Sequence, residues 1–468
     1  MKADICVIGA GSGGLSVAAA AAQFGRKVVL IEKGEMGGDC LNFGCVPSKA
    51  LIAAAHRAHA FQSSTPFGIA AAKPKISAVG LKAHIDGVIA AIAPDDSQER
   101  FTALGCHVIR AAGRFTGPQA VEAGGEEIRA RRFVIATGSQ AFVPDIPGLS
   151  KVAFLTNETL FQLAEIPQHL LILGGGPIGL EMAQAFRRLG AKVTLVQRGP
   201  HVLTRDDPEL AAIVQARLEA EGVRLCKNTK VIRAFKGPVL EIAGEDGVEK
   251  IAGTHLLIAT GRRPNLTGLG LAEAGIAHTA QAITVDAGMR TTNPRVYAIG
   301  DVTGGLQFTH VANYQAGLVI RNALFRLPVR QKTSLLPRVT FTDPELAQVG
   351  LTEAEAAAQG LEVQVTRWPL HRNDRARAMR EDDGLIKVIS DKKGRILGAG
   401  MTGPHAGEWL SFWSLAVTQG MKLSQVAATI IAYPTLAEAS RRAAMSHFAP
   451  LASNPWVRRL IGFLSIFG

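Results

Sequence analysis

A glycine pattern that occurs twice in this chain limits its possible folds more than any other feature. In the first copy, "DICVIGAGSGG", an expected strand turns at Gly9, Gly11 and Gly14 into a helix expected over Leu15–Phe24. A second expected strand, "KVVLIEK", ends at Glu32. This order is the fingerprint of a dinucleotide-binding fold, in which the helix N-terminus faces a pyrophosphate and the acid binds a ribose. An ordinary tight turn, the alternative, would need neither the two strands nor the acid.

The second copy lies in "HLLILGGGPIGLEMAQAFRRLGAKVTLVQR", where the turn glycines are Gly174, Gly176 and Gly179. Two further segments, "FVIATGS" and "LLIATGR", resemble each other, and each follows one fingerprint. Each predicts a strand that returns to the nucleotide at a Thr-Gly turn, where backbone N–H groups meet phosphate or ribose. One such segment could be an ordinary buried strand. Two of them indicate a duplicated α/β dinucleotide-binding fold that holds two nucleotides.

The two fingerprints differ at the end of their second strand. Where the first copy has Glu32, the second has Gln197 and Arg198, with Arg205 shortly after. A carboxylate binds a ribose 2′-hydroxyl and repels a 2′-phosphate, whereas a neutral amide beside an arginine accepts the phosphate. The sequence therefore predicts NADPH rather than NADH at the second site. The alternative is that Arg198 is one more solvated arginine in a basic protein.

The segment "GGDCLNFGCVPSK" places two cysteines, Cys40 and Cys45, close together at the start of an expected helix. A disulfide between them would close a very small loop and would stabilise the fold little, which suits a pair that opens and closes. Pro47 suits the first turn of a helix through Ser48 to about Ala60, so the helix dipole favours a thiolate at Cys45. A zinc site would need four ligands at matching spacing, and inert core thiols would not need the surrounding glycines. The segment therefore predicts a redox-active pair and no bound metal.

Composition limits the protein class and its partners. The chain of 468 residues with a formal net charge of +12 suits several domains and anionic ligands, and no stretch is basic and aromatic enough to predict nucleic-acid binding. The few scattered cysteines favour a reducing compartment. The alanine-rich run to Ala22 resembles a secretory leader, but Asp4 interrupts it and the glycines fit the fingerprint better. No window has the roughly 20 uninterrupted apolar residues of a spanning helix, so we expect a cytoplasmic protein.

A series of motifs along nearly the whole chain resembles one enzyme family. The motifs "VIGAGSGG", "GGDCLNFGCVPSK", "IATGS", "GGGPIGLE", "IATGRRPN", "VYAIGDV" and "YPTLAEA" resemble class I pyridine nucleotide–disulfide oxidoreductases, the family of dihydrolipoamide dehydrogenase, glutathione reductase and mercuric reductase. The resemblance implies FAD at the first fingerprint, with Asp301 on the flavin ribityl chain. It implies that Cys45 is the charge-transfer thiol against the flavin and that Cys40 is the interchange thiol facing the substrate. Lys49 and Glu181 match the ion pair beside the flavin N5, where hydride arrives from the nicotinamide.

The candidate cofactor contacts follow from the fingerprints and the resemblance together. For FAD they are Gly9, Gly11, Gly14, Glu32, Lys33, Lys49, Gly113, Thr137, Gly138 and Asp301. For NADPH or NADH they are Gly174, Gly176, Gly179, Gln197, Arg198 and Gly261.

The resemblance also implies an α/β architecture with two Rossmann-like dinucleotide-binding domains and a C-terminal α+β dimerisation domain. We expect the FAD domain at residues 1–148, the NAD(P) domain at 149–265, a central part returning to FAD at 266–336 and the dimerisation domain at 337–468. In this family the partner's C-terminal segment completes the active site. A homodimer is therefore expected, and a monomer should be inactive.

The C-terminal segment is where the chain departs from these relatives. Dihydrolipoamide dehydrogenase and glutathione reductase have His-Pro-Thr there, with a glutamate downstream that orients the imidazole. This chain has Tyr433 in place of the histidine, although Glu438 remains as the orienting acid. A phenol with a pKa of about 10 is a poor base near neutral pH compared with an imidazole at about 6.5. The C-terminal cysteine pair of mercuric reductase is missing too, because the last cysteine is Cys226.

These observations leave several functions open. The leading hypothesis is that NADPH reduces FAD, FAD reduces the cysteine pair, and the pair reduces a disulfide or a soft metal ion held between sulfurs. The alternatives are a flavoenzyme that reduces a quinone directly, a dihydrolipoamide dehydrogenase-like enzyme without the usual base, and a non-catalytic subunit that keeps FAD for structure.

The C-terminal tail "NPWVRRLIGFLSIFG" allows two interpretations. Trp456, Leu460, Phe463 and Phe467 can share one helical face beside two arginines. This face either packs at the dimer interface or makes a peripheral membrane contact through residues 455–467.

Overall fold

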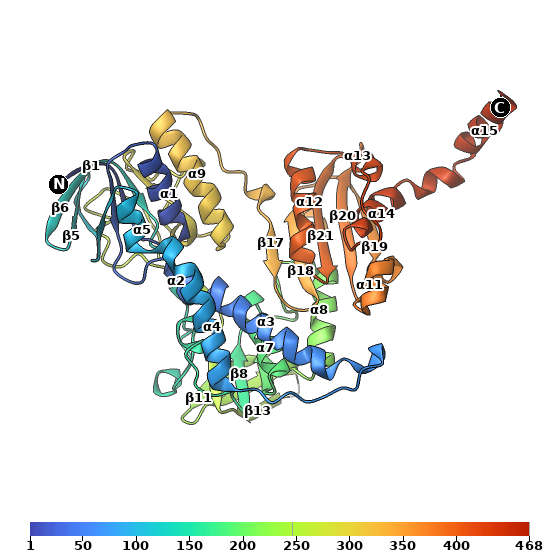
Figure 1. Ribbon diagram of the computed structural model, residues 1–468, viewed down its shortest axis with the longest axis horizontal. Helices are drawn as coiled ribbons and strands as arrows, with labels where there is room; N and C mark the ends of the chain where they lie inside the picture. Colours follow the sequence, from blue (N-terminus) through green and yellow to red (C-terminus); the bar gives the residue numbers. More distant parts are fainter. Residues whose placement is uncertain (246, 468) are drawn as a thin grey trace.

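The computed structural model describes residues 1–245 and 247–467, and it arranges them in three lobes with a separate C-terminal helix (Figure 1). Each lobe is built around its own main sheet. The chain runs from the first lobe to the second, returns to the first through β16 and α9, and then enters the third.

The first lobe contains a seven-stranded sheet in the order β3-β2-β1-β6-β5-β4, with β16 paired to the C-terminal half of β6. The part β3-β2-β1-β6-β16 is parallel, with Ile5 opposite Val28 and Cys6 opposite Phe133. Its central strands are almost continuously apolar, as is typical of parallel strands covered on both faces. The strands are β1 (Lys2–Ile8), β2 (Val28–Ile31), β3 (Cys106–Ile109), β4 (Arg114–Gly117), β5 (Ala120–Ala123), β6 (Glu126–Ile135) and β16 (Val296–Ala298).

Two helices, α1 (Ser12–Gln23) and α9 (Thr309–Phe325), pack against each other over this sheet (Figure 1). Helix α1 begins earlier than the expected Leu15, because its first turn contains Gly13 and Gly14 and lies directly on the glycine turn. The short helix α5 (Gln98–Ala103) precedes β3.

The second lobe repeats the first in a smaller form. Its parallel sheet has the order β10-β9-β8-β14, and a separate antiparallel sheet has the order β11-β12-β13. The strands are β8 (His169–Leu173), β9 (Lys192–Val196), β10 (Arg224–Cys226), β11 (Lys230–Phe235), β12 (Val239–Gly244), β13 (Gly247–Ala252) and β14 (His255–Ile258). The helices are α6 (Asn157–Leu160), α7 (Pro177–Arg188) and α8 (Pro208–Ala220). Strands β7 (Ser139–Ala141) and β15 (Arg262–Pro264) pair where the chain leaves and returns.

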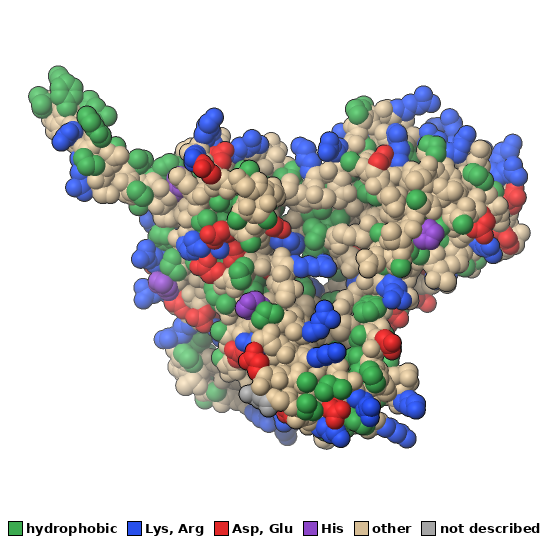
Figure 2. Space-filling view, turned by 180° about the vertical axis from the view of Figure 1, so that it is seen from behind, with side chains coloured by type: hydrophobic (Ala, Val, Ile, Leu, Met, Phe, Trp, Pro, Cys, Tyr) green, Lys and Arg blue, Asp and Glu red, His purple; other side chains and the backbone are tan. Residues whose placement is uncertain are grey.

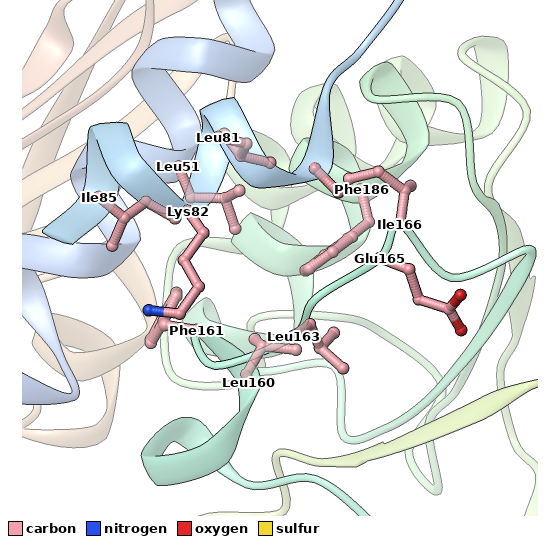
Figure 3. A pocket seen from close by; sticks show the side chains of 11 residues that line it. Leu51, Leu81, Lys82, Ile85, Leu160, Phe161, Leu163, Glu165, Ile166 and Phe186 are labelled. Atoms are coloured by element: carbon pink, nitrogen blue, oxygen red, sulfur yellow. The ribbon is translucent and has the colours of Figure 1, made fainter.

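The helices that carry the cysteine segment, and the helix that follows them, lie between the first two lobes. These are α2 (Gly38–Asn42), α3 (Cys45–Gln62) and α4 (Ala78–Ile92), and α3 packs against both α4 and α7. A small pocket in this seam is lined mainly by apolar side chains such as Leu51, Leu81 and Phe186, whereas Glu165 points away from it (Figure 3). The pocket belongs to the packing that fixes α3 against the second lobe.

The third lobe contains an antiparallel sheet in the order β17-β18-β21-β20-β19. Its strands are β17 (Arg338–Thr340), β18 (Glu345–Gly350), β19 (Val363–Pro369), β20 (Leu385–Asp391) and β21 (Ile396–Gly403). Its helices are α10 (Glu353–Ala358), α11 (Asp374–Met379), α12 (Ala406–Thr418), α13 (Leu423–Ala428) and α14 (Glu438–Ser446). Trp413 is fully buried in its core.

Ion pairs join the third lobe to the second. Lys387 on β20 has a side chain that is only 5% exposed, and its Nζ lies 2.8 Å from Asp207 and 2.7 Å from Glu353. Asp207 is the N-cap of α8, and Glu353 belongs to α10. A buried lysine therefore holds carboxylates from both lobes.

The chain ends in α15 (Pro455–Leu464), which stands away from the third lobe (Figure 1). Among the residues that the structure describes, no helix is both long and apolar enough to cross a membrane.

Candidate active site

The two glycine turns have the same backbone geometry. The φ angle is +106° at Gly9 and +108° at Gly174, a region that side chains rarely adopt. A Cβ atom on Gly9 would lie 2.4 Å from the carbonyl oxygen of Ala136, and one on Gly174 would lie 2.3 Å from that of Ala259. Each turn therefore packs against the strand end of its own Thr-Gly segment, and only glycine fits.

The other glycines of the two turns have different tasks. A Cβ atom on Gly14 or Gly179 would lie 1.9 Å or 2.0 Å from the carbonyl oxygen of the first glycine in its turn. A Cβ atom on the middle glycine, Gly11 or Gly176, would meet no atom within 4 Å. The front of each turn is therefore an open cradle at a helix N-terminus, which fits the pyrophosphate of a dinucleotide.

The residues at the ends of the second strands occupy equivalent places. Glu32 Oε2 accepts a hydrogen bond from the Ala10 N–H at 2.6 Å, and its Oε1 accepts one from the Gly34 N–H at 2.6 Å. Gln197 Oε1 accepts a hydrogen bond from the Gly175 N–H at 2.9 Å. Both side chains thus hold the residue after the first turn glycine, but only the first carries a negative charge.

The remaining nucleotide candidates lie around the same turns. Thr137 Oγ1 donates to the Asn265 carbonyl at 2.9 Å, which ties the first Thr-Gly turn to the segment after the second. Gly138 and Gly261 have φ angles of +66° and +128°. Gly113 lies close to the side chain of Ile31, and Lys33, Arg198 and Arg205 are exposed.

The two cysteines lie on consecutive helices. Cys40 is on α2, and Cys45 is the first residue of α3, with Gly44 as the N-cap and Pro47 in the first turn as expected. Both cysteines are free thiols. Their mutual hydrogen bond, the largest cause, lowers the pKa of Cys45 to about 6 and raises the pKa of Cys40. Burial alone, by contrast, raises the pKa of Cys6 to about 12.

Two further groups support the Cys45 thiolate. The Thr309 hydroxyl lies 3.4 Å from Cys45 Sγ, and both this contact and the charge of Lys49 lower the pKa of Cys45. Thr309 is the first residue of α9, so the N-termini of two helices, α3 and α9, meet at one sulfur atom. Helix N-termini stabilise negative charge. These contacts therefore favour a thiolate on Cys45 over one on Cys40.

Lys49 and Glu181 form an ion pair between α3 and α7. Lys49 Nζ lies 2.8 Å from Glu181 Oε2, and Glu181 is buried. The other carboxylate oxygen accepts a hydrogen bond from the Phe341 N–H at 2.9 Å, and the ammonium lies 4.2 Å from the centre of the Phe341 ring. The pair is one helical turn from Cys45, and it connects all three lobes.

A polar network behind Cys40 was not assigned a role from the sequence. Asp39 Oδ1 accepts a hydrogen bond from Asn157 Nδ2 at 2.8 Å and lies 3.1 Å from Arg262 Nη2. Arg262 Nε donates to Ser139 Oγ at 2.7 Å, and Ser139 Oγ donates to Asp301 Oδ2 at 2.5 Å. Burial raises the pKa of Asp301, which the Ser139 hydrogen bond and the Arg262 charge partly offset.

This network connects the cysteine segment with the expected FAD contact at Asp301. The only signal for it in the sequence is the acid at position 39, directly before Cys40, because a carboxylate beside a thiol needs a counter-charge. Nothing in the local pattern identifies Asn157 or Arg262 as its partners, since both are distant along the chain.

Tyr433 and Glu438 do not bond to each other within one chain. The Tyr433 side chain is 65% exposed, and its hydroxyl donates to Asp374 Oδ2 at 3.0 Å, which raises the pKa of the phenol. Glu438 is buried, and its Oε1 accepts a hydrogen bond from Arg442 Nε at 2.5 Å. Within one chain Glu438 thus pairs with Arg442, one helical turn away on α14, and the phenol bonds to Asp374, so the roles of Tyr433 and Glu438 stay predictions.

No group of three or more metal-ligating side chains occurs among residues 1–245 and 247–467. The site is instead an open nucleotide cradle, a polarised thiol pair and a Lys–Glu ion pair beside it. Such a pair can take up two electrons when its disulfide opens to the dithiol, and it can pass them on when the disulfide closes again.

Comparison with known proteins places this arrangement in a family. Residues 3–316 match pyridine nucleotide-disulphide oxidoreductases, and residues 336–444 match the dimerisation domain of the same family. The mercuric reductase of Streptomyces lividans is 37% identical over 460 residues, which cover 96% of this chain and 97% of that protein. The dihydrolipoyl dehydrogenase of Thermus scotoductus is 37% identical over 454 residues, covering 94% of this chain and 96% of that protein.

Solved structures agree with this placement. The Cu(II) complex of the HOCl-induced flavoprotein disulfide reductase RclA from Escherichia coli has a TM-score of 0.83 at 29% identity, covering 94% of this chain and 99% of that chain. LpdA from Mycobacterium tuberculosis has a TM-score of 0.86 at 27% identity, covering 95% of this chain and 100% of that chain. The predicted family, the fold class and the FAD and NAD(P)H cofactors are thereby confirmed. The chain belongs to the pyridine nucleotide–disulfide oxidoreductases, flavoprotein enzymes that use FAD and NAD(P)H.

Proposed function

We propose that this enzyme uses NADPH to reduce a disulfide or a thiol-bound soft metal ion through the Cys40–Cys45 pair. The observation that carries the proposal is the different setting of the two thiols. Cys45 lies at the N-termini of α3 and α9, with the Thr309 hydroxyl 3.4 Å from its sulfur, and these contacts and Lys49 help to lower its pKa, whereas the pKa of Cys40 is raised. Two adjacent thiols of opposite character suit separate tasks, one facing the flavin and one exchanging with the acceptor.

The chain's own residues fit FAD at the first cradle. Gly11 leaves room for the pyrophosphate, and Glu32 supplies a carboxylate for the ribose. Asp301 is the acid that we assign to the ribityl chain. FAD held there would accept two electrons from NADPH as hydride and would supply two electrons to the Cys40–Cys45 disulfide. Lys49, held by Glu181, places a positive charge next to Cys45 and stabilises its thiolate.

The two cysteines reduce an acceptor disulfide by thiol–disulfide exchange in two steps. The Cys40 sulfur attacks the acceptor disulfide and forms a mixed disulfide, and the proton of the Cys40 thiol passes to the departing thiolate, which leaves as a thiol. The Cys45 thiolate then attacks the Cys40 sulfur, closes the Cys40–Cys45 disulfide and releases the second thiolate. Two electrons pass from the pair to the acceptor.

The proposal includes several finer points. NADPH is preferred to NADH because Gln197 occupies the place of an acid and Arg198 is exposed beside it.

The domains divide at residues 148, 265 and 336. Two chains form a homodimer in which the segment around Tyr433 of one completes the site of the other, with the phenol as a hydrogen-bond donor to a leaving thiolate. Residues 455–467 make a peripheral membrane contact.

An acceptor screen with FAD-loaded enzyme and NADPH tests the main proposal. Disulfides, cupric ion, mercuric ion and quinones are compared for the unmodified enzyme and for Cys40→Ser. Loss of disulfide and metal reduction in Cys40→Ser is the expected result, and Cys226→Ser serves as the matched control. If Cys40→Ser retains these activities, or if only quinones are reduced and the variant reduces them equally well, electrons leave the flavin directly and the proposal fails.

A further inference from the structure

The C-terminal helix contains no buried residue in the described part of the chain. Helix α15 follows the 3-10 turn at Ala449–Ser453, precedes a second turn at Ser465–Phe467, and extends into solvent away from the third lobe (Figure 1). The dimerisation-domain match ends at residue 444, so the helix lies beyond the family's own dimer-forming unit.

Local interactions build this helix in its exposed position. The Asn454 side chain accepts a hydrogen bond from the Trp456 N–H at 2.9 Å, and Pro455 stands in the first turn. These are the N-terminal signals that helices favour. A helix of 10 residues is nevertheless marginal in water without a surface to pack on.

The exposed face of the helix is apolar and its flank is basic. Figure 2 shows hydrophobic side chains gathered at the end of the projecting segment, with basic side chains beside them. Trp456 is 76% exposed and Phe467 is 74% exposed. The other exposed apolar side chains are Leu460, Ile461, Phe463, Leu464 and Ile466.

The charge of the segment has one sign. Arg459 lies 5.4 Å from the Trp456 ring, and Arg458 Nε donates to the Ala452 carbonyl at 2.7 Å, so both arginines are fixed near the base of the helix. The sequence contains no Asp or Glu after Glu438. The segment therefore has no acidic side chain that would repel a negatively charged surface.

We infer that α15 lies flat on an anionic lipid surface, with its apolar face among the headgroups and acyl chains and its arginines on the lipid phosphates. The inference rests on the peripheral membrane contact included in the proposed function, and it names the lipid chemistry and the orientation of the contact. A short amphipathic helix with arginines and aromatic residues has the composition of interfacial helices, and its length excludes a membrane span. The charge complementarity favours anionic lipid over a second copy of this basic chain.

Vesicle flotation of the full-length, FAD-loaded enzyme tests this. Vesicles of phosphatidylcholine with phosphatidylglycerol are compared with vesicles of phosphatidylcholine alone. We expect binding to the anionic vesicles, weakened by salt, and a blue shift of Trp456 fluorescence. Arg458→Gln with Arg459→Gln should lower the partition coefficient about thirtyfold, because each basic residue near an anionic surface contributes about 1 kcal/mol. Arg129→Gln with Arg131→Gln removes the same charge from the first lobe and should have little effect.

Several results would overturn the inference. These are equal binding to both vesicle types, no binding by the unmodified enzyme, or the same loss in both double variants. A change of oligomeric state, measured by sedimentation after deletion of residues 454–468, would show that a second copy covers the helix. NADPH-dependent reduction of a soluble acceptor, measured without lipid, should be unchanged in all these variants, so failure of this inference is distinct from failure of the proposed reductase activity.

Discussion

Replacing Thr309 by Val should raise the pKa of Cys45 by about one unit. The Thr309 hydroxyl lies 3.4 Å from the Cys45 sulfur, and it is one of the groups that lower the pKa of Cys45 to about 6. A hydrogen bond to a charged group contributes about 1.5–3 kcal/mol, and one pKa unit corresponds to about 1.4 kcal/mol, which sets an upper range of about one to two units. The long contact at an exposed sulfur favours the lower value. The thiolate fraction of Cys45 at pH 7 should then fall from about nine-tenths to about half.

The assay is a pH titration of the long-wavelength charge-transfer band of the NADPH-reduced, FAD-loaded enzyme. In the unmodified enzyme the band should fade as the pH falls through about 6, because the Cys45 thiolate takes up a proton. The midpoint should move up by about one unit in Thr309→Val and stay in place in Thr309→Ser, which keeps the hydroxyl. An unchanged midpoint in Thr309→Val, or an equal shift in both variants, would refute the reasoning.

Three further perturbations test other parts of the structure. Lys387→Met should lower the free energy of unfolding, measured by urea denaturation, by about 3–5 kcal/mol, because it leaves the buried Asp207 without its ion-pair partner. The control Lys392→Met, at an exposed ion pair, should change the free energy of unfolding by less than about 1 kcal/mol. The pKa of Lys387 is raised, so its stabilising charge is present at neutral pH and is lost only as the pH rises through that pKa. The kcat/KM for NADPH should exceed that for NADH by about tenfold or more, and Gln197→Glu with Arg198→Ala should reverse the preference. Equal use of both cofactors by the unmodified enzyme would show that Arg198 is only a surface charge. The unmodified enzyme should oxidise dihydrolipoamide slowly, and Tyr433→His should raise the rate, because a base suited to neutral pH contributes about 10²- to 10⁴-fold to the rate. Rapid turnover by the unmodified enzyme that is unchanged in Tyr433→Phe would contradict the role given to the phenol.

The local parts of the site could be predicted because their geometry is set by neighbouring residues. Gly9 and Gly174 predict their turns, because the backbone conformation there is one that side chains rarely adopt. The strands on either side identify each turn as part of a dinucleotide-binding fold. Cys45 could be placed at a helix N-terminus from Pro47 alone, although α3 begins two residues before that proline. The partners of Tyr433 and Glu438 within one chain, Asp374 and Arg442, could not be predicted from relatives that have a histidine at position 433.

The sequence by itself determined the duplicated dinucleotide fold, the redox pair and the amphipathic tail, since each is a short pattern whose meaning depends on residues close by. The tertiary structure decided which distant groups tune that chemistry. Thr309 reaches Cys45 from a helix 264 positions later, and Arg262 reaches Asp39 only because β15 returns to the first lobe. Such contacts depend on how the lobes pack, and packing is a property of the whole core rather than of any local pattern.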